Sequence, residues 1–163
     1  MHRNAQLITD FYSAFADQNG QKMSAAYDRD ATFSDPVFQN LKGPECGGMW
    51  RMLTGQAKDF ELTFRDVVAD DTTGSAHWDA RYTFSATGRV VNNSIEAVFE
   101  FNDGKIHKHV DTFDLWKWTR MALGVPGVLL GWTPLVQNKV RGQANAQLQK
   151  FLAKEANESG SVS

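Results

Sequence analysis

The sequence predicts an α+β fold, in which helices of the N-terminal third cover one side of a curved antiparallel sheet. Two observations support this prediction. Before residue 59, apolar residues recur every three or four positions, as on the buried face of a helix. From residue 59 onward they alternate with polar residues, as on a half-buried strand. The 163 residues suit one domain with one core.

Three segments of the N-terminal third have helical spacing. Asn19 and Gly20 mark the end of the first segment, and Pro44 opens the third. The stretch 31–38 is expected to be extended, because Pro36 disfavours helix at the residue before it. The apolar stripes are Leu7, Ile8, Phe11, Ala14 and Phe15 in the first segment, Met23, Ala26 and Tyr27 in the second, and Met49, Trp50 and Leu53 in the third.

Four runs of alternating residues follow, and turn residues separate them as in a meander of hairpins. One face of the runs is apolar and the other is polar, so we expect the helices to cover the apolar face. The runs span 59–68, 76–85, 90–101 and 106–114. In the first three, the apolar side carries Phe60, Leu62, Phe64, Trp78, Ala80, Tyr82, Phe84, Asn93, Ile95, Ala97, Phe99 and Phe101.

The chain after Asp114 differs in character. A run dense in Trp and apolar residues is followed by an amphipathic pattern over 136–154. We expect residues 1–115 to form the main domain, 116–155 to form a helical extension packed on it, and 156–163 to form a flexible tail.

Composition excludes several classes of function. The net charge is −2, the pI is about 6.1, and no run of Lys or Arg stands out, so neither nucleic acid nor a membrane is the expected partner. Cys46 is the single cysteine, which excludes an intrachain disulfide. The N-terminus lacks the apolar core of a signal peptide, and no apolar run approaches the roughly 20 residues that cross a bilayer. We expect a cytoplasmic location.

The helical segments lead into YDRDATFSDPVF (27–38), and the meander ends in FEFNDGKIHKHVDTFD (99–114). In order and spacing, residues 5–115 resemble the SnoaL-like branch of the nuclear transport factor 2-like superfamily. Ketosteroid isomerases, polyketide cyclases and limonene-epoxide hydrolases belong to it. The resemblance implies a cone-shaped sheet with an apolar ligand pocket at its open end. Many members only bind, so the fold leaves catalysis open.

Within this resemblance, Asp35 lies where ketosteroid isomerases keep their proton-shuttling carboxylate. Their two oxyanion donors have no counterpart, since Phe11 and Ala97 fall at those positions and Tyr12 is one residue away. One such donor is worth about 10²–10³ in rate, so steroid isomerisation itself is not expected. Asp111 is the best match to the late-strand carboxylate of SnoaL-like cyclases.

Asp35 itself has two interpretations. In an apolar pocket, burial would raise the pKa of its carboxyl and suit it to act as a general base. An Asp before Pro also caps turns through backbone N–H groups, which lowers the pKa of the carboxyl. The direction of the shift therefore distinguishes the two interpretations.

The run IHKHVDTFD (106–114) places His107, His109, Asp111 and Phe113 at alternate positions, which share one face of a regular strand. His109 and Asp111 could form an acid–base pair, line a hydrated pocket mouth, or form a buried pair that satisfies itself. A metal would need three converging ligands, and the sequence suggests no further one. We therefore expect neither a metal nor a cofactor.

Aromatic and amide side chains on the apolar side are candidates for lining the pocket, although core packing explains any one of the aromatic ones. Asn93 is the most informative, because a carboxamide among apolar side chains needs a partner. The candidates are Tyr12, Trp50, Trp78, Tyr82, Asn93, Phe99 and Phe113.

Two surfaces also have several interpretations. The polar face of the sheet could form cross-strand charge pairs, or the homodimer contact that many relatives make through this face. The run GVPGVLLGWTP (124–134) could be a lid over the pocket, a membrane contact or a dock for a partner. We favour the lid, because an exposed apolar patch is a liability. The charged residues of the sheet face are Asp79, Arg81, Glu96, Glu100 and Lys108.

Together these features predict a protein that binds a small, mostly apolar molecule carrying an oxygen function. As an enzyme it would be a cofactor-free isomerase or cyclase, with Asp35 as the base and the pair His109 and Asp111 as acid or relay. Asn93 or Tyr12 would donate to the carbonyl. The alternative is a non-catalytic binding or interaction module, such as a ligand carrier or a membrane-peripheral protein.

Overall fold

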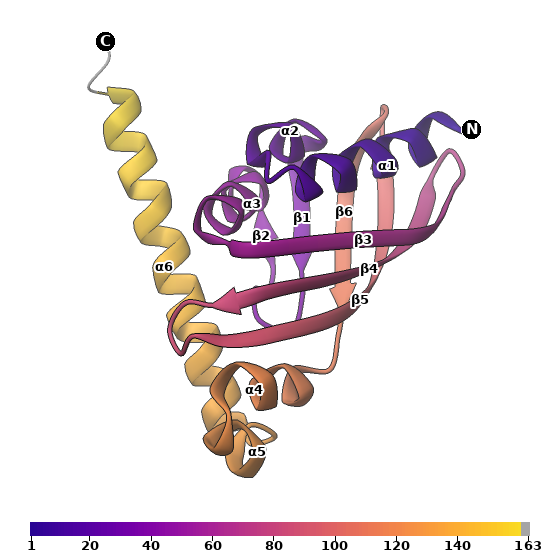
Figure 1. Cartoon of the computed structure of the whole chain (residues 1–163). Helices are drawn as coiled ribbons and strands as arrows, with labels where there is room; N and C mark the ends of the chain where they lie inside the picture. Colours follow the sequence, from indigo (N-terminus) through magenta and orange to yellow (C-terminus); the bar gives the residue numbers. More distant parts are fainter. Residues whose placement is uncertain (161–163) are drawn as a thin grey trace.

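The computed structural model describes residues 1–160 and shows a curved six-stranded sheet wrapped around three helices (Figure 1). The strand order is β2-β1-β6-β5-β4-β3, and neighbours are antiparallel except for the parallel pair β1 and β6. The predicted α+β fold is confirmed. The strands are β1 (Tyr27–Ser34), β2 (Leu41–Lys42), β3 (Lys58–Ala69), β4 (Thr73–Phe84), β5 (Arg89–Asn102) and β6 (Lys105–Thr112).

The three N-terminal helices cover one face of the sheet, called the inner face below. They are α1 (Arg3–Ala16), α2 (Gly20–Ala25) and α3 (Pro44–Gln56). The side chains of His2 and Asn19 cap α1 and α2, because each accepts a backbone N–H of the first turn. The core between helices and sheet is rich in aromatic rings, among them Phe11, Tyr12, Phe15, Phe33, Trp50, Trp78 and Phe99.

Two strands differ from the prediction. The meander expected over 59–114 corresponds to β3 through β6, and β1 and β2 extend the sheet beyond β6. Tyr27, whose spacing from Met23 and Ala26 predicts a helix, begins β1 and pairs with Ile106. Parallel pairing joins strands that are far apart in sequence, so no local pattern indicates it.

A bulge in β6 decides which of its residues face the core. Pairing with β5 shifts between Phe101–Ile106 and Glu100–Lys108, so His107 is an extra residue in β6. As a result His107 is exposed, whereas His109 and Asp111 are buried. The prediction that His107 shares a face with His109 is wrong, because it assumes a regular strand.

Three further helices flank one end of the sheet (Figure 1): α4 (Leu115–Leu123), α5 (Val125–Leu130) and α6 (Pro134–Gly160). α4 packs on β5, and α5 packs on α4 at the tip of the molecule. α6 packs on α3, where Leu148 is fully buried and Arg51 forms two hydrogen bonds of 2.9 Å with Glu155.

Helix α6 continues through Gly160, whereas the sequence predicts a tail from residue 156. Residues 161–163 of that predicted tail lie outside the described residues. Within residues 1–160, no helix is both long enough and apolar enough to cross a membrane.

Candidate functional site

A chain of hydrogen bonds runs through the core from α3 to β6. The Nε1–H of Trp50 donates to the hydroxyl oxygen of Tyr27 over 2.7 Å. This oxygen lies 2.8 Å from Nδ1 of His109, whose Nε2 lies 2.8 Å from Oδ1 of Asp111. All four side chains are buried. The structure therefore brings the predicted pair together and adds two members to it.

The donors give this chain a direction. An indole N–H only donates, so the Tyr27 oxygen accepts from Trp50, and we assign its own hydrogen to the bond with Nδ1 of His109. The remaining imidazole hydrogen is then assigned to Nε2, which donates to Asp111. The rings of Phe11, Phe33 and Phe99 pack against the imidazole, and Asp111 at the end of these hydrogen bonds is also buried.

Five buried side-chain polar atoms have no hydrogen-bond partner among the described residues, and three of them belong to predicted site residues: Oδ2 of Asp111, the hydroxyl of Tyr12 and Nε1 of Trp78. Burial raises the pKa of Tyr12 well above its ordinary value, and the nearby charge of Asp111 raises it further. The rings of Tyr12 and Trp78 lie 6.0 Å apart. An unpaired buried polar group costs about 1–3 kcal/mol, so these atoms are candidates for contact with polar atoms of a ligand.

Asp35 lies in the loop between β1 and β2, where it forms a tight turn. Its Oδ1 accepts the N–H groups of Val37 (2.7 Å) and Phe38 (2.6 Å), and no described residue bonds to Oδ2. Burial raises the pKa of Asp35 from its ordinary value of 3.8 to about 7. The Phe38 and Val37 N–H groups act in the opposite direction, and the charge of Asp111 adds to the rise.

Asp70, in the turn between β3 and β4, provides an internal comparison. Its Oδ1 accepts the N–H groups of Thr72 and Thr73, and its own N–H bonds to the Thr73 carbonyl, as the Asp35 N–H bonds to the Phe38 carbonyl. These bonds lower the pKa of Asp70, which is fully exposed. The two N–H groups are the main cause at Asp70, where the hydroxyls of Thr72 and Thr73 add to the lowering, whereas burial reverses the direction at Asp35.

Tyr82 lies near Asp35, whereas no contact joins Asn93 to Asp35. Burial raises the pKa of Tyr82, and the charge of Asp35 contributes, which places the two side chains near each other. Trp118 of α4 donates to the Tyr82 oxygen over 2.9 Å, so the Tyr82 hydrogen stays available to another acceptor. The half-buried Asn93 has no side-chain hydrogen bond to any described residue.

Other predicted site residues belong to the packed core. Trp50, Trp78 and Phe99 are at most 7% exposed, and the N–H of Trp50 already bonds to Tyr27. Phe113 is half-buried and touches the core as well as the cluster around α4. Helix α6 reaches the Asp35 loop, since Nε of Arg141 donates to the carbonyl of Pro36 over 2.8 Å.

Three residues of the site escaped the sequence analysis. Tyr27 follows a helical pattern and carries no local signal of its bond to His109. Trp118 stands in the Trp-rich run that the sequence singles out, but its contact with Tyr82 joins separate elements. Arg141 is 105 residues from Pro36 in the sequence, and no pattern connects the two.

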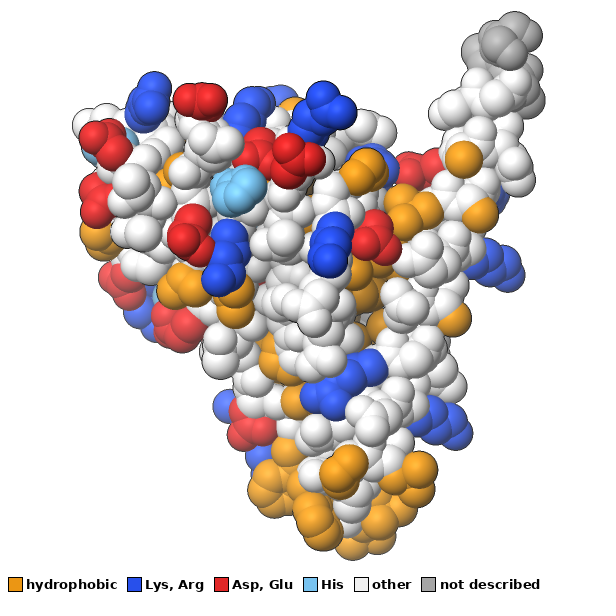
Figure 2. All heavy atoms as spheres, turned by 180° about the vertical axis from the view of Figure 1, so that it is seen from behind, with side chains coloured by type: hydrophobic (Ala, Val, Ile, Leu, Met, Phe, Trp, Pro, Cys, Tyr) orange, Lys and Arg blue, Asp and Glu red, His pale blue; other side chains and the backbone are white. Residues whose placement is uncertain are grey.

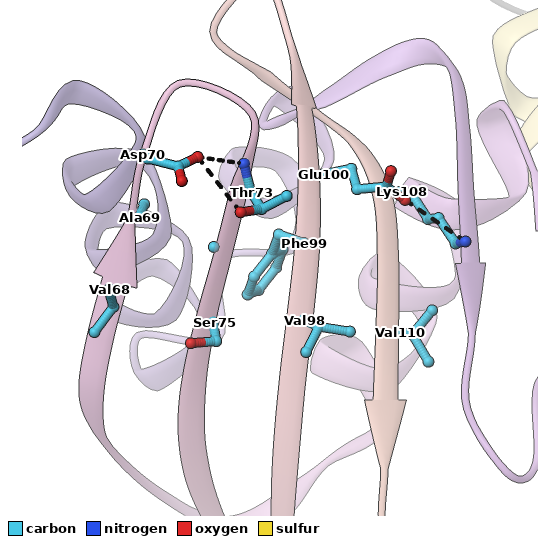
Figure 3. Close-up of a pocket in the computed structure, with 11 residues that line it drawn as sticks. Val68, Ala69, Asp70, Thr73, Ser75, Val98, Phe99, Glu100, Lys108 and Val110 are labelled. Atoms are coloured by element: carbon cyan, nitrogen blue, oxygen red, sulfur yellow. Dashed lines mark hydrogen bonds and ion pairs between the residues drawn. The ribbon is translucent and has the colours of Figure 1, made fainter.

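A hollow of about 530 Å³ lies on the outer face of β3 to β6, opposite the buried chain (Figure 3). Val68 and Val98 line it together with Val110, and an ion pair of 3.5 Å joins Lys108 to Glu100 at its side. A second hollow on the sheet, of about 320 Å³, is lined by polar residues of β3, β4 and β5, including Asn93. Of the charged residues predicted for the outer face, Asp79 is half-buried and the other four are exposed, and Glu96 and Asp79 both bond to His77.

The surroundings of the possible metal ligands and of the single thiol determine what chemistry these groups can do. Within residues 1–160, no group of three or more His, Cys, Asp and Glu side chains is placed to hold a metal ion. His107 instead bonds to Asp28 on the surface, 2.7 Å away. Burial raises the pKa of the Cys46 thiol to about 12, so it is protonated at neutral pH.

The SnoaL-like domain family matches residues 8–109, and the chain therefore belongs to this family. The resemblance seen in the sequence is confirmed. None of the curated proteins matches the sequence.

Solved structures share the fold at low sequence identity. An LEH-like epoxide hydrolase of M. tuberculosis is 19% identical, with a TM-score of 0.63 over 78% of this chain and 95% of its own. IdmH of Streptomyces antibioticus, a proposed polyketide cyclase, is 22% identical, with a TM-score of 0.60 over 76% of this chain and 100% of its own. TerC, co-crystallised with polyporic acid, is 14% identical, with a TM-score of 0.63 over 74% and 98%.

Proposed function

We propose that the protein binds a small, mostly apolar molecule with a carbonyl or hydroxyl group, and that Asp35 moves a proton on it without a cofactor. The observation that carries this proposal is the position of Asp35, whose Oδ1 is held by two backbone N–H groups in a turn while Oδ2 bonds to no described residue. Asp70 shows the lowered pKa of a structural cap, whereas the pKa of Asp35 is about 7, near the optimum for a general base at neutral pH. The epoxide hydrolase-like and cyclase-like structural neighbours have the same fold.

The proposed reaction is an isomerisation or a cyclisation. The carboxylate of Asp35 takes a proton from a carbon next to a carbonyl, and the electron pair moves to the carbonyl oxygen. A hydrogen from Tyr82 or Asn93 stabilises that oxygen. The protonated Asp35 then returns the proton to another atom of the same molecule. Asp111, oriented by His109, would bind a hydroxyl of the ligand through Oδ2.

A thermal-shift screen followed by turnover assays tests this function. Small apolar ketones, lactones, epoxides and aromatic hydroxy acids form the panel, and a ligand should raise the melting temperature of both the wild type and Asp35→Asn. Turnover of that ligand should fall by about 10²–10⁴-fold in Asp35→Asn and stay unchanged in the matched turn variant Asp70→Asn. Unchanged turnover in Asp35→Asn would rule out Asp35 as the base.

One observation favours the alternative of a binding module without chemistry. The chain from Trp50 to His109 satisfies its own hydrogen bonds and lies inside a tightly packed aromatic core. In that case these hydrogen bonds serve to orient Asp111 toward a ligand, and the screen would find binding without turnover of any compound.

We also infer that two copies pair through the outer face of the sheet. The exposed Val68 and Val98 form an apolar strip with Val110, bordered by the pair Lys108 and Glu100. Such a strip between charged borders suits a self-complementary contact. The cytoplasmic location expected from the sequence stays a prediction.

A further inference from the structure

An exposed apolar patch forms the tip of the molecule beyond α4 (Figure 2). Its side chains are between 49% and 82% exposed and come from α5, the turn after it and the start of α6. They do not cover the inner face of the sheet, so the lid predicted for 124–134 is wrong: α5 packs on α4 and points outward. The tip patch consists of Val125, Val128, Leu129, Leu130, Trp132 and Leu135.

The tip patch is held in place by close packing. A Cβ at Gly127 would collide with the carbonyl of Thr119, and one at Gly131 with the Thr119 side chain, so α5 lies directly against α4. The indole N–H of Trp132 donates to the carbonyl of Leu129 over 3.1 Å. This side chain can therefore enter an apolar phase without leaving its polar atom unpaired.

The segment of the sequence that contains the tip patch differs in charge from the rest of the chain. Residues 115–154, which include α4, α5 and most of α6, contain six basic residues and not one acidic residue. The rest of the chain holds the other eleven of 17 basic residues and all 19 acidic ones. Lys117, Arg120 and Lys139 are closest in sequence to the patch, and Arg120 lies 4.4 Å from the ring centre of Trp116.

We propose that the tip patch inserts into the surface of a bilayer containing anionic lipids. Its apolar side chains would enter the acyl boundary, Trp132 would lie at the headgroup level, and the basic residues would face anionic headgroups. The whole-chain charge of −2, which led us not to expect a membrane partner, conceals this division. The proposal is independent of the chemistry proposed for Asp35.

A second copy of the chain fits the patch less well. A two-fold contact would place the patch against itself and bring two purely basic segments together. Such a contact loses electrostatic free energy, whereas contact with anionic lipid gains it.

Vesicle co-sedimentation of the full chain tests the proposal. Binding to phosphatidylcholine vesicles with about 30% phosphatidylserine should exceed binding to pure phosphatidylcholine by about tenfold or more, and salt should weaken it. Val125→Asp, at a position 70% exposed, should lower the partition coefficient by about tenfold or more. Leu135→Asp, at a position 82% exposed, serves if Val125→Asp fails to fold by circular dichroism.

Gln21→Asp is the matched control, since Gln21 is exposed on α2, outside both the tip patch and the outer face of the sheet, and the substitution adds the same negative charge. It should bind vesicles as the wild type does. Absence of binding to anionic vesicles would overturn the proposal, and so would equal losses in Gln21→Asp and Val125→Asp. If Val125→Asp instead abolished self-association while leaving vesicle binding intact, the patch would be a contact between copies.

Discussion

Asp35 and Asp70 show how the surroundings of a residue outweigh its local bonds. Both accept two backbone N–H groups on Oδ1 and both close the same kind of turn. In water these bonds favour the ionised carboxylate, as at Asp70. At Asp35 the loss of hydration outweighs them, and the charge of Asp111 adds to the effect. Between pH 3.8 and about 7, the Asp35 carboxyl is therefore mostly protonated, whereas the Asp70 carboxyl is ionised.

Asp35→Asn is expected to change how stability depends on pH. The folded pKa of about 7 lies above the ordinary 3.8, so the stabilising contribution is fully present below pH 3.8 and is lost as pH rises toward 7. The loss is about 1.4 kcal/mol per pH unit between these values. Asn does not titrate. The free energy of unfolding of the variant, measured by urea denaturation, should therefore rise relative to that of the wild type as the pH increases from 3.8 to about 7.

Asp70→Asn is the control for this series. Because the pKa of Asp70 is lowered, its contribution to stability is lost as pH falls. The free energy of unfolding of this variant should therefore not rise relative to that of the wild type at higher pH. Parallel pH profiles for the wild type and Asp35→Asn would contradict the raised pKa of Asp35.

Tyr27→Phe should destabilise the protein by about 1–3 kcal/mol. The change removes one hydroxyl but leaves two buried partners, the N–H of Trp50 and Nδ1 of His109, without a bond. Tyr82→Phe is the control, because Tyr82 is less buried and bonds only to Trp118. Urea denaturation measures both, and equal small losses would show that the buried chain contributes little.

Elements differ in how far the sequence predicts them. Helices α1 and α3 and strands β3 to β5 follow from apolar periodicity, because each buries one continuous face. The bulge at His107 does not, since it depends on how β6 pairs with β5, and it moves one imidazole out of the site. Asp35 and Asp111 could be named from the family resemblance. Tyr27, which bonds to His109, and Arg141, which bonds to the Pro36 carbonyl, come from elements distant in sequence and could not.

Helix α6 is expected to be an integral part of the fold. Leu148 is its one fully buried residue among those described, and Leu148→Ala should lower the free energy of unfolding by about 2–4 kcal/mol. The exposed neighbour Gln149→Ala should cost much less, despite its hydrogen bond to Glu45. In chemical denaturation, α6 and the rest of the fold are expected to unfold in one shared transition. A loss under about 0.5 kcal/mol for Leu148→Ala would mean that α6 detaches before the rest unfolds.

The molecule as a whole has two faces that its composition does not reveal. The outer face of the sheet carries an apolar strip beside a charge pair, and the tip patch belongs to a segment, 115–154, whose charged residues are all basic. A total charge near zero hides the difference, because the acidic residues lie outside 115–154. Only the folded arrangement separates the two surfaces in space (Figures 1 and 2).

Val98→Asp should convert a dimer into monomers. The substitution places a carboxylate in the centre of the apolar strip, where the pairing of two copies would bury it without a partner. Sedimentation velocity across a concentration series measures this, with Val125→Asp as the control at the tip. A monomeric wild type at every concentration would refute pairing through this face.

The parallel pairing of β1 with β6 also sets the order in which the protein can be built during synthesis. β1 leaves the ribosome early but finds its partner only after residues 105–112 have emerged, and the contacts between them close a long loop. Arg141 and Leu148 emerge later still, so the loop of Asp35 is fastened to α6 after the sheet is complete. A nascent chain that ends before α6 would therefore lack the helix that covers α3 and bonds to the loop of Asp35.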